Sequence, residues 1–395
     1  MLASAQVATI EVTNPGKDVR RDVAIVETEN NLPPGDYMVI EHIISGNRPE
    51  VLQEIPSQRI EGGLLFLADI PAKSKGVYTI HPRTTQSTQE YPQRVYAQLK
   101  LRDQKLRYPR INSVEFLGSE DPRYTYDAIY GHGAMWESDY VGFRVYMDHR
   151  QSIDLYGKKH PRMELDTVNF YSNRDLLKAG YGEDILWAGQ SVGAGSFRGL
   201  REGKPVYVDS VAARGQRVVE AGPLRTVVEV WDKDWKINGK TLQMKQVYTM
   251  YGGHRDVQVD IYLEGASDKD LFATGAQKLE MENEGLLLKK EGLVGSWGRN
   301  VPEKGAPDLI EGVGIGVYAE PQYVARVQED DLNYLIYLHP VDGHIRYHLN
   351  VCADMQLEGG YHNAKDWFEY LKSWREELRH PLRKMTHFNS KGSKK

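Results

Sequence analysis

The chain has 395 residues and a formal net charge of −5, which is enough length for one large domain or two smaller ones. Acidic and basic residues are intermixed, which argues against a nucleic-acid-binding protein, and no run of 18 apolar residues predicts a membrane span. The single cysteine, Cys352, excludes an internal disulfide.

Short strands separated by glycine and proline turns dominate the first part of the chain. They are expected at residues 22–27, 37–43, 63–67 and 76–80. The Thr-, Gln- and Ser-rich segment at 84–92 is the best candidate boundary. We therefore predict one large β domain over residues 1–395, within which residues 1–95 form a candidate separate N-terminal β layer.

The stretch at 130–148 combines a glycine-flanked histidine with a patterned strand. Glycines on both sides of His132 predict a sharp loop that exposes the imidazole. In the strand that follows, Arg144 shares a face with Tyr140 and Tyr146, and such an arginine suits a carboxylate beside a stacked sugar ring. The alternative is a structural loop in which Glu137 caps backbone amides.

Two further loops carry candidate ligand-binding residues. The turn at 156–162 includes Lys159 and His160 and could attract an acidic ligand, although charged turns are more often only solvated. The glycine-rich segment at 181–196 lacks the pattern of a dinucleotide fingerprint and offers Asp184 and Gln190 as hydroxyl binders. Other substrate-binding candidates, chosen by position, are Glu137, Asp139, Tyr140 and Trp297.

Long alternating strands fill the middle of the chain, at residues 224–231, 241–251 and 255–263. Asn238-Gly239 between the first two is a strong signal for a hairpin. Long antiparallel strands of this kind favour an all-β fold, a large sandwich.

The segment 342–349 also alternates. His344, Arg346 and His348 share one face of the expected strand, and the apolar residues between them share the other. Three potential cations in a row suit an anion, whereas two neutral histidines could hold a metal or move a proton. A solvated strand face is the alternative.

One convincing helix is expected over residues 364–380. Its apolar stripe comprises Trp367, Tyr370, Leu371, Trp374 and Leu378. Asn363 is placed to cap the helix, and the stripe predicts packing against the sandwich. The tail at 388–395 is expected to be disordered.

Several blocks together resemble a family of secreted bacterial proteins of long-unknown function, found in polysaccharide-utilisation systems for uronic-acid glycans such as pectin and ulvan. The blocks are residues 12–15, 70–73, 130–146, 181–194, 221–226 and 361–371. An ulvan oligosaccharide dehydratase is similar to this family. The resemblance implies a β-supersandwich like those of galactose mutarotase and several polysaccharide lyases, and a periplasmic or secreted location. The chain departs from the family pattern at 136–139, so substrate preference could differ.

The leading functional hypothesis is β-elimination at a uronic acid residue of an acidic oligosaccharide. A cation must neutralise the sugar carboxylate, a base must remove the C5 proton and an acid must protonate the leaving oxygen. We expect Arg144 or Arg346 as the cation, His132 or His348 as the base and Tyr146 as the acid. No cofactor is required by this scheme, although a divalent metal is possible, and no obligate protein partner is expected. Alternatives are an aldose mutarotase or uronate epimerase, a non-catalytic glycan-binding protein, and a two-carboxylate hydrolase.

Overall fold

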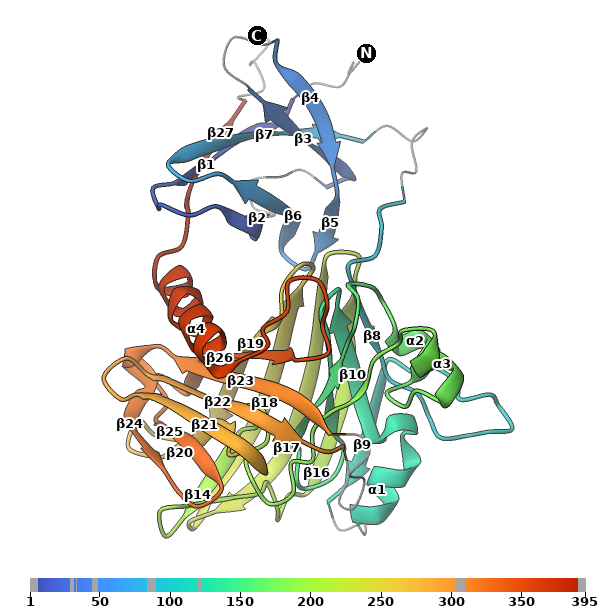
Figure 1. Cartoon of the computed structure of the whole chain (residues 1–395), viewed down its shortest axis with the longest axis vertical. Helices are drawn as coiled ribbons and strands as arrows, with labels where there is room; N and C mark the ends of the chain where they lie inside the picture. Colours follow the sequence, from blue (N-terminus) through green and yellow to red (C-terminus); the bar gives the residue numbers. More distant parts are fainter. Residues whose placement is uncertain are drawn as a thin grey trace.

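The computed structural model describes residues 6–28, 32, 34–44, 49–83, 90–118, 122–302 and 310–389. Most of the expected boundary at 84–92 and most of the expected tail therefore lie outside the described residues. Antiparallel sheets make up most of this structure, and they confirm the predicted all-β sandwich with a C-terminal helix packed on it (Figure 1).

Two small sheets with their own core form the upper part of Figure 1. One has the order β27-β1-β7-β3-β4 and the other β2-β6-β5. Apolar residues at every second position, among them Ile10, Phe66 and Tyr78, meet between the sheets because successive side chains of a strand point to opposite faces. The strands are β1 (Ala8–Asn14), β2 (Arg20–Thr28), β3 (Tyr37–Ile43), β4 (Val51–Ile55), β5 (Ser57–Ile60), β6 (Gly63–Ile70), β7 (Ser74–Pro82) and β27 (Arg383–Phe388). The proposal of a separate layer up to residue 95 stays a prediction.

The end of the chain corrects one expectation. Residues 383–388 form strand β27, which pairs antiparallel with β1 from Ala8↔Phe388 to Thr13↔Arg383. Phe388 therefore belongs to a sheet and not to a disordered tail. The sequence pattern did not predict this strand because Arg383, Lys384 and His387 make the segment polar, as is common at the edge of a sheet.

A nine-stranded sheet forms the main layer of the large sandwich, in the order β21-β22-β23-β26-β19-β18-β17-β16-β9. The predicted hairpin at Asn238-Gly239 is confirmed, since these two residues join β17 to β18 with φ of 49° and 77°. The strands are β9 (Ser113–Leu117), β16 (Ala213–Ala221), β17 (Arg225–Ile237), β18 (Lys240–Tyr251), β19 (Asp256–Glu264), β21 (Met281–Leu288), β22 (Leu293–Asn300), β23 (Glu311–Ala319) and β26 (His344–Ala353).

Two five-stranded sheets complete the sandwich. One has the order β13-β12-β11-β10-β8, with β8 (Val95–Gln98), β10 (Gly133–Ser138), β11 (Val141–Tyr146), β12 (Ile153–Gly157) and β13 (Glu183–Asp184). The other has the order β15-β14-β20-β25-β24, with β14 (Arg198–Arg201), β15 (Lys204–Val206), β20 (Phe272–Gln277), β24 (Val324–Glu329) and β25 (Asn333–Leu338). Both contribute to one continuous core with the nine-stranded sheet.

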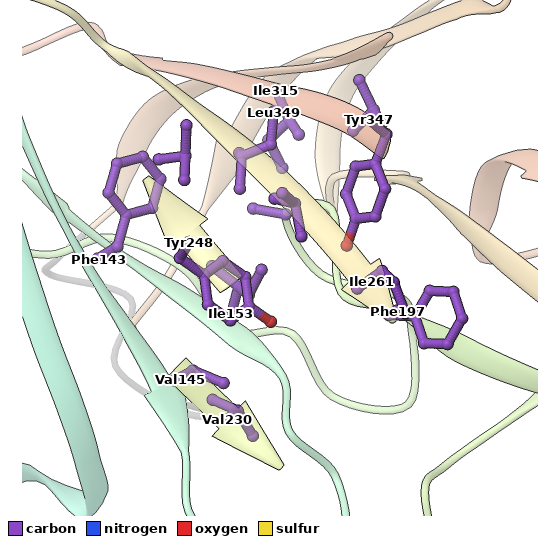
Figure 2. Close-up of a cluster of buried hydrophobic side chains, with 14 of the residues drawn as sticks. Phe143, Val145, Ile153, Phe197, Val230, Tyr248, Ile261, Ile315, Tyr347 and Leu349 are labelled. Carbon is purple, nitrogen blue, oxygen red and sulfur yellow. The ribbon is translucent and has the colours of Figure 1, made fainter. Parts of the chain in front are cut away.

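Figure 2 shows part of this core, to which β11 and β26 both contribute. Phe143 and Val145 of β11 and Tyr347 and Leu349 of β26 point into the same buried cluster. Because side chains alternate along a strand, the residues between them must point out of the sandwich on its two opposite sides.

The predicted helix is α4 (Ala364–Arg379), capped by Asn363, whose side chain accepts the backbone N–H of Asp366 at 2.9 Å. Its buried side lies on β22 and β23, where Leu371 and Trp367 join an apolar cluster with Trp297. A glycine at 316 makes this docking possible, since a Cβ there would come within 2.3 Å of Leu371. The remaining helices are short: α1 (Pro122–Ala128), η2 (Tyr130–His132), α2 (Leu165–Val168), α3 (Arg174–Lys178) and η4 (Pro321–Tyr323).

Candidate functional site

The predicted sharp loop at His132 is present. Gly131 and His132 have φ of 72° and 69°, a left-handed conformation that glycine adopts readily and that strains a histidine. Gly133 lies so close to β11 that a Cβ would fall 1.9 Å from the carbonyl oxygen of Val145. The two glycines therefore permit the turn and its tight contact with the sheet, and together they fix the position of the imidazole.

His132 is held in one tautomer. Its Nδ1–H donates to the backbone oxygen of Tyr126 in α1 at 3.0 Å, and its ring stacks on the Tyr126 ring at a centroid distance of 3.7 Å. Nε2 is then the unprotonated nitrogen, and Arg102 Nη2 lies 3.3 Å from both ring nitrogens. Burial lowers the pKa of His132 to about 4, against which the hydrogen bond to Tyr126 acts in the opposite direction. The imidazole is therefore neutral at physiological pH.

Arg144 lies behind this histidine, on the outward face of β11, and only 2% of it is exposed. Its guanidinium pairs with Asp154 at 2.6 Å and Asp184 at 2.8 Å and donates to the Tyr171 hydroxyl at 2.5 Å. This corrects the expected role of Arg144 as the group that grips a substrate carboxylate, because two protein carboxylates already occupy it. Asp184 likewise binds Arg144 and not a sugar hydroxyl.

Tyr146 contacts both Arg144 and Asp154. Its hydroxyl donates to Asp154 Oδ2 at 2.7 Å and accepts from Arg144 Nη2 at 3.1 Å. Burial, followed by the charge of Asp154, raises the pKa of Tyr146 well above its ordinary value. Tyr146 therefore stays protonated and can act as a proton donor but not as a base.

The sequence analysis missed two cations of this region that are more accessible than Arg144. They are Arg102, which lies beside His132, and Arg150.

The guanidinium of Arg150 lies over the rings of Tyr126 and Tyr146, at 5.0 and 4.9 Å from the centroids, and its side chain is 33% exposed. Arg150 also donates to Asp148 Oδ2 at 2.7 Å. Asp148 and Arg150 stand two residues apart in a turn, and such a pair does not indicate function in a sequence. Tyr126, in the short helix α1, does not indicate it either.

We call this group the His132 cluster. Its members are Tyr126, His132, Arg144, Tyr146, Arg150 and Tyr171. Of the four expected catalytic residues, the structure brings together His132, Arg144 and Tyr146.

The fourth, His348, lies elsewhere, which corrects the expectation of a single site. His344, Arg346 and His348 do share one face of β26, but that face points away from the core shared with β11. The His132 cluster and this row of cations therefore occupy opposite outer sides of the sandwich. The core between them is filled by the apolar side chains that alternate with these polar residues along β11 and β26.

The row on β26 has its own partners. His344 Nε2 and Arg346 Nε lie 2.8 and 2.7 Å from the same oxygen of Asp260. His348 lines a cavity of about 430 Å³ next to α4, together with Tyr318. Burial lowers the pKa of His348 to about 4. His344 and Arg346 thus already bind an anion, the carboxylate of Asp260, which belongs to the protein itself.

Several other expected ligand-binding residues have structural roles. Glu137 is fully buried, pairs with Lys158 and accepts the backbone N–H groups of Glu164 and Leu165, which is the amide-capping alternative. Asp139 accepts the Gly253 N–H at 2.7 Å.

Two aromatic candidates are also structural. Tyr140 lies under the guanidinium of Arg255, 4.7 Å from its ring centroid. Trp297 is 9% exposed and packs under α4.

The remaining candidates are scattered. His160 pairs with Glu358 at 3.1 Å, and the backbone oxygen of Lys159 accepts the Leu357 N–H at 3.0 Å, so this turn is tied to the loop before α4. Gln190 lines a separate cavity of about 560 Å³ near β14. None of the three approaches the His132 cluster through a contact found among the described residues.

Metal and membrane signals were also sought in the described part of the chain. It contains no group of three His, Cys, Asp or Glu side chains placed to hold a metal ion. None of its helices is long and apolar enough to cross a membrane.

Comparison with known proteins gives a family but no activity. A glycosyl hydrolase family 38 protein from Enterococcus faecalis is similar with a TM-score of 0.48 and 8% identity, covering 98% of this chain and 48% of its own. An alpha-mannosidase from Enterococcus faecalis V583 gives 0.46 and 8%, with 96% and 46% covered. The chain thus spans about half the length of these proteins, and likenesses this weak carry no argument about chemistry. No curated protein matches the chain. The chain belongs to the family described as a domain of unknown function (DUF4861), whose model matches residues 44–383.

Proposed function

We propose that the protein is a carbohydrate-active enzyme that catalyses β-elimination at a uronic acid residue of an acidic oligosaccharide, with the His132 cluster as its active site. One observation carries the proposal. A neutral histidine of fixed tautomer, a protonated tyrosine and a partly exposed arginine all contact the ring of Tyr126. Base, acid and cation are the three groups that this reaction requires.

Arg150 replaces Arg144 as the group that binds the sugar carboxylate. A carboxylate beside the C5–H bond resists further negative charge, so a cation must offset the charge that develops as the proton leaves. Arg150 is accessible, and cation–π contacts with two tyrosine rings hold its guanidinium in place. Its present partner, Asp148, holds it through Oδ2 at one edge of the guanidinium.

The reaction balances within these groups. His132 Nε2, once Arg102 has moved aside, accepts the proton from C5, and the C4–O bond breaks as the C4–C5 double bond forms. Tyr146 gives to the leaving oxygen the proton that it donates to Asp154 in the substrate-free protein. Solvent then returns the proton from His132 to Tyr146. A bound uronate beside His132 raises the pKa of the imidazole from its low resting value, because a nearby negative charge favours the protonated form.

Arg144 acts here as a positioning residue. Its contacts with Tyr146 and Tyr171 orient both hydroxyls, and its charge stabilises the phenolate that Tyr146 becomes after it donates. Asp154 and Asp184 keep Arg144 itself in place.

Mass spectrometry after incubation with di- and tetrasaccharides from pectin and from ulvan tests the proposal. Loss of one water from an intact oligosaccharide, or cleavage without gain of water, together with a new ultraviolet absorbance, supports β-elimination. Gain of water means hydrolysis, and a changed proton NMR spectrum at constant mass means epimerisation or mutarotation. Binding without any product means a glycan-binding protein, and each of these three results rejects the elimination chemistry.

A further inference from the structure

Two cavities that the His132 cluster does not use meet at Asp209. The larger, of about 560 Å³, is lined by Arg198, Arg201, Lys204, Tyr207 and Asp209 among others. The smaller, of about 230 Å³, is lined by Thr125, His149, Asp209, Ser210 and Arg214 among others. His149 and Tyr207, one from each cavity, are in edge-to-face contact at 5.4 Å. We call the two cavities together the Asp209 groove.

The smaller cavity contains three buried polar atoms without a hydrogen-bond partner among the described residues. They are His149 Nδ1, Asp209 Oδ1 and Arg214 Nη1. Asp209 Oδ1 has only a loose ion pair, 3.8 Å from Arg201. Nearly all buried polar groups in native proteins are hydrogen-bonded, so three exceptions in one cavity require an explanation. A donor, an acceptor and an imidazole together match a ligand with several hydroxyl groups.

The larger cavity contains a buried cation that forms no ion pair with a carboxylate of the described residues, although the charge of Asp148 acts on it. Arg198 is 1% exposed and donates to the Phe197 oxygen at 3.0 Å and to Ser152 Oγ at 2.9 Å, both of them uncharged. It forms no ion pair among the residues that the structure describes, and its face lies against the Tyr207 ring at 5.0 Å.

Two of the three acids that line the same cavity have neighbours other than Arg198. Asp330 accepts from the backbone of Leu332 and Asn333, and Asp209 is nearest to Arg201. Burying an unpaired charge is costly, which indicates that Arg198 has an anionic partner outside this chain.

The groove begins next to the His132 cluster. Thr125 precedes Tyr126, and His149 precedes Arg150, so two lining residues of the smaller cavity are chain neighbours of two cluster members. Adjacent Cα atoms are about 3.8 Å apart. A chain molecule that places one unit on Tyr126 and Arg150 can therefore place the next units along the groove.

We propose that the Asp209 groove binds further sugar units of an acidic oligosaccharide, with His149, Asp209 and Arg214 holding hydroxyl groups and Arg198 holding a carboxylate or sulfate. The identity of this ligand rests on the proposed function. The groove itself rests on its own unpaired polar atoms and on its buried arginine, which forms no ion pair among the described residues.

Isothermal titration calorimetry with the same pectin and ulvan oligosaccharides tests the groove without requiring turnover. The wild type should bind tetrasaccharides at least about tenfold more tightly than disaccharides, because hydrogen bonds to charged groups are added. Asp209→Asn and His149→Ala should each remove most of that difference and leave disaccharide binding unchanged. Both side chains are partly exposed, so these variants should fold, which circular dichroism checks. Exposed residues outside the groove give the matched controls Asp268→Asn and His362→Ala.

The outcomes separate the two proposals. If chain length does not affect affinity, or if both variants keep the full tetrasaccharide advantage, the groove proposal is wrong, whatever the activity. If the advantage is present and depends on Asp209 and His149 but no product forms, the groove is upheld and the elimination chemistry fails. Pectin and ulvan tetrasaccharides distinguish the two anions, because pectin oligosaccharides carry carboxylates and ulvan oligosaccharides also carry sulfate.

Discussion

The outward faces of β11 and β26 have the same alternating sequence pattern, but they lie in different environments. On β11, Arg144 is buried under Phe170 and Tyr171 and bound by two aspartates. On β26, Arg346 is 38% exposed at its side chain and shares one aspartate with His344. The alternation of the sequence is alike in both strands, so the difference arises from what covers each face.

The cover is complete in one case and partial in the other. The segment 165–184 folds over β11 and β12 and supplies Phe170, Tyr171 and Asp184. The far end of the β26 face instead meets Tyr318 and α4 through Trp374. A polar face that is fully covered becomes an ordered network, whereas a face at the margin of a docked helix keeps a cavity.

The largest expected effect is on stability. Arg144→Met should lower the free energy of unfolding by about 3–5 kcal/mol, because it leaves Asp154 and Asp184 buried without a counter-charge. Arg346→Met, the matched change on the other face, should cost less than about 1 kcal/mol because its ion pair is partly solvated. Guanidinium unfolding measures both, and equal losses would remove the contrast between the faces.

The next effect is on activity. His132→Ala should lower kcat on a uronate disaccharide by roughly 10² to 10³, the usual value of a general base or of one transition-state contact. His348→Ala should leave kcat near that of the wild type, because His348 lies on the opposite side of the core. Initial rates of ultraviolet absorbance give both values, and the reverse ranking would transfer the active site to the β26 face.

A smaller effect concerns the pH dependence of stability. The folded pKa of His132 is lowered to about 4 and that of His348 also to about 4, both chiefly by burial. Each neutral histidine therefore contributes stability that is present above about pH 6.5 and is lost as the pH falls toward 4, where only the unfolded chain takes up the proton. His132→Asn and His348→Asn should each flatten this fall relative to wild type.

Comparison with the wild type is needed because other buried groups titrate in the same range with the opposite sign. Burial raises the pKa of Asp232 to about 6, and this carboxyl contributes stability that declines as the pH rises. Unfolding curves between pH 4 and 7 supply the slopes. An unchanged slope in either variant would show that the histidine in question has the same pKa in the folded and the unfolded chain.

The smallest expected effect is a shift in the pH profile of kcat/KM. With His132 as the base, the acidic limb of kcat/KM should fall nearer to pH 4 than to 6.5, since this ratio reports the free enzyme. The raised pKa of Tyr146 should keep the wild-type profile level on the alkaline side up to about pH 10. The profile of His132→Ala should lack the acidic limb. If the limb persists in this variant, it belongs to the titration of another group.

The sequence allowed much of the fold to be predicted but less of the candidate site. The Asn238-Gly239 hairpin, the capped helix at α4 and the strained turn at His132 all follow from local backbone preferences and short-range spacing. Arg150, Tyr126 and most of the lining of the Asp209 groove could not be found, because a solvated turn and a functional one have the same composition. Gln190, which lines the larger cavity of that groove, is the exception, since the sequence analysis named it as a ligand-binding candidate.

By itself, the sequence determined which side chains of β11 and β26 point outward, since a strand alternates whatever its surroundings. It also determined that His132 stands on a glycine-flanked turn. Only the tertiary structure decided that the two apolar faces pack against each other, so that His132 and His348 lie on opposite sides. It also decided that Arg144 forms ion pairs within the protein, whereas Arg198 forms none among the described residues. Arg144 pairs with Asp154 and Asp184, 10 and 40 residues further along the chain, and no local sequence pattern encodes which charges meet.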